Sequence, residues 1–278
     1  MQLDKTRIAI RERSFIDILD LALAVLREHA GPLTLALIAG AVPVALINHW
    51  LLSNMLLEDA YDSSDVAGYL FVLALLVCWE VPLATAPITL YLGQALFLER
   101  PGPGKLLRDF ATSLPQLILY QVLARAVIVW PVIFIPVVFV GWPYLSEIIL
   151  LERNPWRKRS QTGTSTISRS SNMHGRNRGE LFNRWFGSLL LGLLLTFVFW
   201  RSLWFLVRIL SGNVESNTPQ FTIWFNVALW LVIGYFAIVR FLSYLDLRIR
   251  TEGWEVELLL RAEAARLNRQ ITWEGKGS

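Results

Sequence analysis

The chain has 278 residues, of which 54% are hydrophobic and only 17% are charged, and its mean hydropathy is +0.46. Soluble domains carry about a quarter charged residues, so this composition excludes an ordinary soluble enzyme or binding domain and indicates an integral membrane protein. The net charge of +4 does not indicate nucleic acid as a partner, because the basic residues fall in particular connections and not on one soluble face.

The first predicted element is an amphipathic helix over residues 14–32, in which Ser14 and Asp17 have the spacing of a helix cap. We expect Gly31-Pro32 to end this helix. Its apolar face indicates a helix that lies in the membrane interface or against the bundle. That face consists of Phe15, Ile18, Leu19, Ala22 and Leu26.

Six apolar segments follow, each long enough to cross a bilayer, which takes about 20 residues. The sequence therefore predicts an all-α integral membrane protein of about six transmembrane helices with amphipathic interfacial helices at both ends. Pro82 and Pro87 predict a bend in the second span, and Trp130-Pro131 is the expected turn between the third and fourth. The six spans cover residues 33–53, 67–97, 113–131, 132–151, 186–210 and 220–243.

The basic residues give this threading a direction. Segments 1–32, 98–112, 152–185 and the tail after 243 hold five, three, eight and six Lys or Arg residues, whereas 54–66 and 211–219 hold none. Cytoplasmic connections are enriched in Lys and Arg. We therefore expect a protein of the bacterial cytoplasmic (inner) membrane, with both termini in the cytoplasm.

Three parts of the chain lie outside the membrane in this scheme: the N-terminal segment 1–32, the basic loop 152–185 and the tail 244–278. Residues 160–179 are rich in Ser, Thr, Asn, Gly and Arg, so we expect poor order across much of that loop. The tail predicts a second amphipathic helix over 254–269. Six residues are expected to contact anionic headgroups or to lie where the chain leaves the bilayer: Arg157, Lys158, Arg159, Asp246, Arg248 and Arg250.

Motifs for catalysis, cofactors or metals are nearly absent. PGPGKLL at 101–107 resembles a phosphate loop only faintly, because Glu99 replaces the first glycine and Leu106 the final Ser or Thr. The three histidines are far apart in sequence, and the single cysteine, Cys78, cannot complete a zinc site with them. We expect no catalytic residue, no metal site and no cofactor.

Charges inside predicted spans are energetically costly and therefore indicate candidate functional residues. These are Glu80, Arg125, Glu147 and Arg201. Glu80 is expected to be protonated or paired with Arg125 or Arg201. Two readings stay open: a proton or substrate relay beside a proline-broken helix, and a structural ion pair or a hydrogen bond to backbone that Pro82 leaves free.

Three stretches carry a resemblance: FLERPGPGKLLRDFATSLPQLI (97–118), EIILLERNPWRKRS (147–160) with GRNRGELFNRWFGSLLLG (175–192), and YLDLRIRTEGWEVELLL (244–260). Together they resemble a group of uncharacterised bacterial multi-pass membrane proteins, which are similar to the membrane domain attached to some glycerophosphodiester phosphodiesterases. The resemblance implies a membrane-embedded helical bundle. It implies no enzyme activity, because the catalytic barrel has no counterpart in this chain.

The sequence leads first to a non-enzymatic scaffold or assembly subunit for envelope proteins or lipids, with the lipid bilayer, anionic headgroups and a membrane protein as partners. The alternative is a transporter or lipid-handling protein that uses the polar, proline-broken second span around Glu80. A membrane enzyme using Asp246 or Glu252 ranks below both, since no nucleophile, metal cluster or paired acid supports it. The oligomeric state is left open.

Overall fold

A computed structural model describes residues 14–55, 63–96, 102–123, 143–152, 165–175, 178–211 and 220–252 of the chain. Every regular element within these ranges is helical, which confirms the all-α prediction for the described part. The predicted tail helix 254–269 lies outside the described residues, as do Arg125, Arg157, Lys158 and Arg159.

The chain begins with two consecutive helices, α1 (Phe15–Glu28) and α2 (Ala30–Leu52). The predicted cap is confirmed, because Asp17 N donates to Ser14 Oγ and Ser14 N donates to Asp17 Oδ2, both at 3.2 Å. The prediction that Gly31-Pro32 ends the first helix is wrong, since both residues lie in the first turn of α2. Proline is tolerated there because the first backbone N–H groups of a helix have no intrahelical acceptor.

The second predicted span is broken at Thr85 into α3 (Ser63–Ala84) and α4 (Ala86–Ala95). Pro82 lies inside α3 and removes one backbone donor, while Pro87 lies in the first turn of α4, where that loss has no effect. The Val81 carbonyl accepts from both the backbone N–H of Thr85 at 2.9 Å and its hydroxyl at 2.7 Å. The second span is thus interrupted between its two prolines, and whether it is bent or tilted stays a prediction.

The remaining elements are shorter in the middle of the chain and longer at its end. Two of them exceed the length needed to cross a bilayer, which is about 20 residues. They are α5 (Pro103–Leu117), the π-helical turn η2 (Ile118–Leu123), α8 (Leu145–Glu147), the π-helical turn η3 (Ile148–Glu152), α9 (Thr166–Gly175), α10 (Arg178–Ser211), the π-helical turn η4 (Gln220–Phe225) and α11 (Asn226–Glu252).

Four helical stretches in the described part are long and apolar enough to span a membrane: Ala30–Leu52, Asp65–Ala95, Gly179–Leu210 and Thr222–Thr251. They correspond to the first, second, fifth and sixth predicted spans. Of the other two predicted spans, 113–131 and 132–151, residues 124–142 lie outside the described part. The structure therefore supports a multi-pass membrane protein with four candidate spans.

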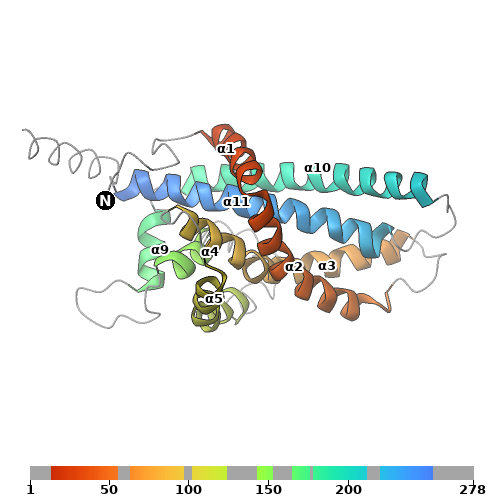
Figure 1. The fold of residues 1–278 in the computed structure, drawn as a ribbon, viewed down its shortest axis with the longest axis horizontal. Helices are drawn as coiled ribbons and strands as arrows, with labels where there is room; N and C mark the ends of the chain where they lie inside the picture. The colour runs from red at the N-terminus through yellow and green to blue at the C-terminus, as the bar shows by residue number, and fades with distance from the viewer. Residues whose placement is uncertain are drawn as a thin grey trace, which may run out of the picture.

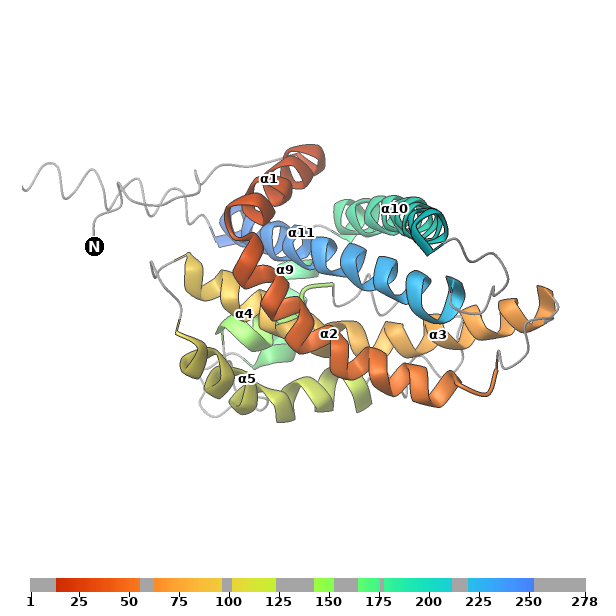
Figure 2. The ribbon, with the colours of Figure 1, turned by 45° about the vertical axis from the view of Figure 1, so that its right-hand side comes forward.

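Helix α11 is the centre of the bundle. Figures 1 and 2 show it between α10 on one side and α2 and α4 on the other. Of its most apolar window 39% is buried, against 6% for α10, so α10 is peripheral and presents most of its apolar surface outward. Exposed apolar side chains on α2 and α10 are those of a surface that lies in lipid, where they need no protein partner.

Helix α1 packs across α11. Ile18 and Ala22 are fully buried in the cluster that also contains Ile238 and Phe241 of α11. The Tyr235 hydroxyl donates to the Leu19 carbonyl at 3.0 Å and ties the two helices together. Of the two positions left open for this helix, the structure selects the one against the bundle.

The Ser- and Thr-rich loop also packs where the sequence predicts poor order. Residues 166–175 form α9, in which Met173 is 2% exposed and Thr166 and Ser170 are fully buried. Met173 belongs to an apolar cluster with Ile148 and Tyr244. One apolar residue and several hydroxyl groups satisfied inside the protein suffice to hold a segment whose composition resembles that of a disordered loop.

Candidate functional site

Within the described residues, Glu80 is held by an amide. Asn48 of α2 donates from Nδ2 to Glu80 Oε2 at 2.6 Å, and Asn48 is 1% exposed. The predicted partner Arg201 lies over the rings of Trp200 and Trp204, with its guanidinium carbon 5.6 and 5.1 Å from their centroids. The expected pairing of Glu80 with Arg201 is therefore corrected. Arg201 instead makes cation–π contacts with two tryptophan rings, which stabilise its charge in an apolar setting.

Glu147 forms a second, separate site. It is fully buried, and Arg240 of α11 donates from Nε to its Oε1 at 2.6 Å. Ser146 bridges the pair, because its hydroxyl donates to Glu147 Oε2 at 3.0 Å and accepts from Arg240 Nη2 at 2.9 Å. Among the described residues, Glu80, Glu147 and Arg201 thus have three different sets of partners.

An ionic network ties α10 to α11 at the end where α10 begins. Arg184 donates to Asp246 at 2.8 Å, and both side chains are buried, at 7% and 3% exposure. Arg250 donates to Asp246 at 2.6 Å and makes two further bonds to Glu180, at 2.8 and 2.9 Å. Arg250 therefore adopts the intramolecular pairing that the sequence left open for it, with Asp246 at its centre.

A neighbouring ion pair fixes α9 to η3. Arg169 donates from Nε and Nη2 to the two oxygens of Glu152, at 2.8 and 3.1 Å, and the Tyr244 hydroxyl donates to the same carboxylate at 2.8 Å. Burial alone would raise the pKa of Glu152, but the hydrogen bonds from Arg169 and Tyr244 and the charges of Arg169 and Arg248 outweigh burial and hold that pKa below its usual value. Glu152 is thus an anchor for the loop helix.

A groove of about 310 Å³ runs between α3, α10 and α11. Its walls are apolar over most of their length. They include Val77 and Val81 from α3, Leu189, Gly192 and Leu193 from α10, and Val232, Ile233 and Phe236 from α11.

One end of the groove is polar. Tyr144, Arg184, Ser188, Arg240 and Ser243 line it there, next to the ionic network and to the Glu147–Arg240 pair. The Arg240 side chain is 21% exposed, and its Nη1 has no partner among the described residues. The groove thus joins a long apolar wall to an end that carries a partly accessible guanidinium group.

Sequence reasoning missed the two residues that give the groove its polar end. Arg240 is a charge inside the predicted span 220–243, so the criterion that selected Glu80 also applies to it. Arg184 falls in the loop 152–185 in the sequence-based scheme, because α10 begins eight residues before the predicted span. That α3 and α10 both line this groove carries no local signal in the sequence.

Comparisons of the chain with protein-family models, with curated proteins and with solved structures find no match. The arguments about its function therefore rest on its own residues.

Proposed function

We propose that this chain is a lipid-handling protein of a bacterial inner membrane, with both termini in the cytoplasm, and that it holds a membrane lipid in the groove between α3, α10 and α11. The observation that carries the proposal is the groove's chemistry, an apolar cleft between membrane-spanning helices that ends at Arg240 and Arg184.

The apolar walls suit an acyl chain. A volume of about 310 Å³ lies at the lower end of the range of small-molecule sites, which is about 300–1,000 Å³. Because α10 has its outer face in lipid, a chain can enter from the bilayer without crossing water.

The polar end suits a headgroup with a negative charge. Arg240 is fixed by Glu147 and Ser146 and keeps donors directed at the groove. A guanidinium group binds phosphate through two parallel hydrogen bonds, which places a lipid phosphate beside Arg240 with its chain along α11.

The scaffold hypothesis stays the rival proposal. It rests on the absence of catalytic motifs in the sequence, on amphipathic segments at the two ends of the chain and on the basic loop 152–185. The lipid-handling proposal still involves the proline-broken helix, because Val77 and Val81, on either side of Glu80 in the sequence, line the groove. Glu80 itself does not line it and bonds to Asn48.

A matched pair of substitutions on α10 tests the proposal. Leu193→Trp adds bulk at the groove wall, whereas Leu190→Trp adds the same bulk at a position that does not line the groove; the two leucines are similarly exposed, at 61% and 53%. We expect native mass spectrometry of protein extracted gently from its membrane to show less retained lipid for Leu193→Trp and unchanged lipid for Leu190→Trp. Equal retention by the two variants would rule the groove out as the lipid site.

A further inference from the structure

Helix α5 is amphipathic, and its polar stripe is partly buried. The polar residues recur every three or four positions and so lie on one face. Asp109 and Ser113 on this stripe are buried, at 7% and 6% exposure, while Lys105, Arg108 and Thr112 are exposed. The polar residues of the stripe are Lys105, Arg108, Asp109, Thr112, Ser113 and Gln116.

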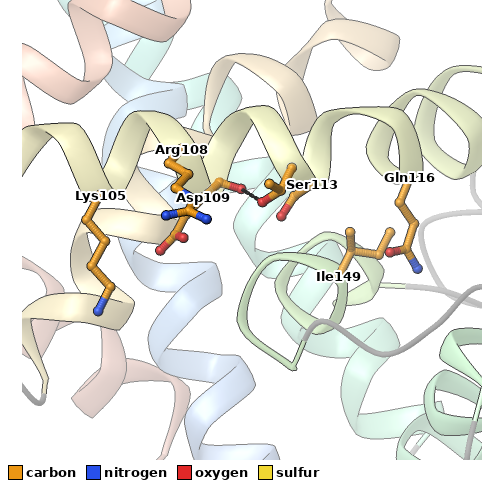
Figure 3. A pocket seen from close by; sticks show the side chains of 7 residues that line it. Lys105, Arg108, Asp109, Ser113, Gln116 and Ile149 are labelled. Atoms are coloured by element: carbon orange, nitrogen blue, oxygen red, sulfur yellow. Dashed lines mark hydrogen bonds between the residues drawn. The ribbon is translucent and has the colours of Figure 1, made fainter.

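The stripe borders a cavity of about 620 Å³ whose opposite side is Ile149 of η3. Figure 3 shows the labelled polar side chains spaced along α5, with Ile149 beyond them on a neighbouring element. This cavity is separate from the groove, since the two share no lining residue.

Hydrogen bonds hold the cavity walls in place. Gln94 of α4 donates to Asp109 at 3.0 Å, and Gln116 donates to Thr166 of α9 at 2.8 Å. Helices α4 and α9 thus fix α5 at two points along its stripe, and the cavity has a defined shape.

Two cations on the stripe have donors to spare. Within the part of the chain that the structure describes, Lys105 and Arg108 have neither an ion-pair nor a hydrogen-bond partner. Ser113 is 6% exposed and its side chain lines the cavity beside them, so its hydroxyl offers a third donor to a ligand there. The two cations and the single carboxylate of Asp109 leave the lining with a net positive charge.

We propose that this cavity binds a phosphate group. Phosphate offers acceptor oxygens to an ammonium, a guanidinium and a hydroxyl at once, and it carries the negative charge that the lining lacks. The ligand is either a soluble phosphate compound or the headgroup of an anionic lipid, since both present the same oxygens. The proposal does not depend on PGPGKLL as a phosphate-loop motif, and it is independent of the lipid in the groove.

The test uses the full chain in nanodiscs of phosphatidylcholine. Inorganic phosphate is titrated by calorimetry, and in a second arm phosphatidylglycerol is added to the nanodisc and its retention is measured by native mass spectrometry. We expect binding in at least one arm, with an affinity or retention at least about tenfold lower in the double variant Lys105→Ala/Arg108→Ala. Binding of inorganic phosphate in the first arm would show that the cavity can take a soluble phosphate compound. Binding in the second arm alone would show that it takes a lipid headgroup.

Two further variants separate a site from a general effect of charge. Ser113→Ala keeps every charge and is expected to weaken binding about two- to tenfold. Arg201→Ala/Arg208→Ala removes two cations from α10, outside the cavity, and is expected to leave binding unchanged. No binding in either arm, or equal weakening by the two double variants, overturns the proposal.

Discussion

At the scale of single residues, the buried pair of Glu147 and Arg240 is the most consequential contact between segments distant in sequence. Glu147 has no exposed surface, so its charge is tolerated only because Arg240 and Ser146 surround it. Removing one member of such a pair leaves the other charge buried and uncompensated. Removing both leaves only polar or apolar groups of similar size.

We predict that Glu147→Gln lowers the free energy of unfolding by about 3–5 kcal/mol and that Glu147→Gln/Arg240→Gln loses less than the sum of the two single changes. Titration from mild detergent into a denaturing detergent measures these values. Arg201→Gln, on the exposed face of α10, serves as the control and is expected to cost less than about 1 kcal/mol. Additive losses for the pair would show that the two charges do not stabilise each other.

At the scale of elements, the crossing of α2 over the end of α3 depends on one missing side chain. A Cβ atom at Gly40 would overlap the backbone carbonyl of Ala84, and a backbone group cannot rotate away. Gly31, in the first turn of the same helix, has no atom within 4 Å of such a position. Glycine at position 40 therefore sets how closely the two helices approach beside the break at Thr85.

We predict that Gly40→Ala destabilises the protein by about 1–3 kcal/mol, because the helices must move apart. Gly31→Ala is the matched control on the same helix and is expected to be neutral or slightly stabilising, since alanine has the higher helix propensity. Thermal unfolding in detergent compares the two. A loss for Gly31→Ala as large as that for Gly40→Ala would contradict the close-crossing argument.

At the scale of the whole molecule, the threading is the same whether four or six segments cross the bilayer. The two segments that differ, 113–131 and 132–151, follow one another, so they add two crossings or none and change no other connection. The predicted side of every basic segment is then independent of the span count. The long helices α10 and α11, of 34 and 27 residues, exceed the about 20 residues that cross a bilayer.

We predict that, with Cys78 replaced by serine, cysteines introduced as Asp59→Cys and Asn217→Cys react with a membrane-impermeant thiol reagent from outside the cell. Thr162→Cys should react only after the membrane is opened, because it lies among the basic residues of the loop 152–185. Labelling of Thr162→Cys in intact cells would contradict the predicted orientation of the chain in the membrane. The variant Trp130→Cys distinguishes six spans from four. Labelling in intact cells is expected for six spans, where position 130 lies in the outer turn, and protection is expected for four.

The sequence by itself determined the all-α class, the positions of four long apolar helices, the Ser14–Asp17 cap and the break near Pro82 and Pro87. These features depend on residues that are near one another along the chain, through hydropathy, period and missing backbone donors. The resemblance to the phosphodiesterase membrane domain and the place of Arg157, Lys158 and Arg159 stay predictions.

Only the tertiary structure decided which helix faces meet. It paired Glu80 with Asn48 and joined Arg240 to Glu147, 93 positions away in the sequence. It placed polar residues of α5 along a cavity, where Ser113 lies buried, although the sequence assigned 98–112 to a connection and began a span at 113. In a chain whose helices are apolar on nearly every side, local sequence specifies each helix, whereas close packing and the few polar groups decide their partners.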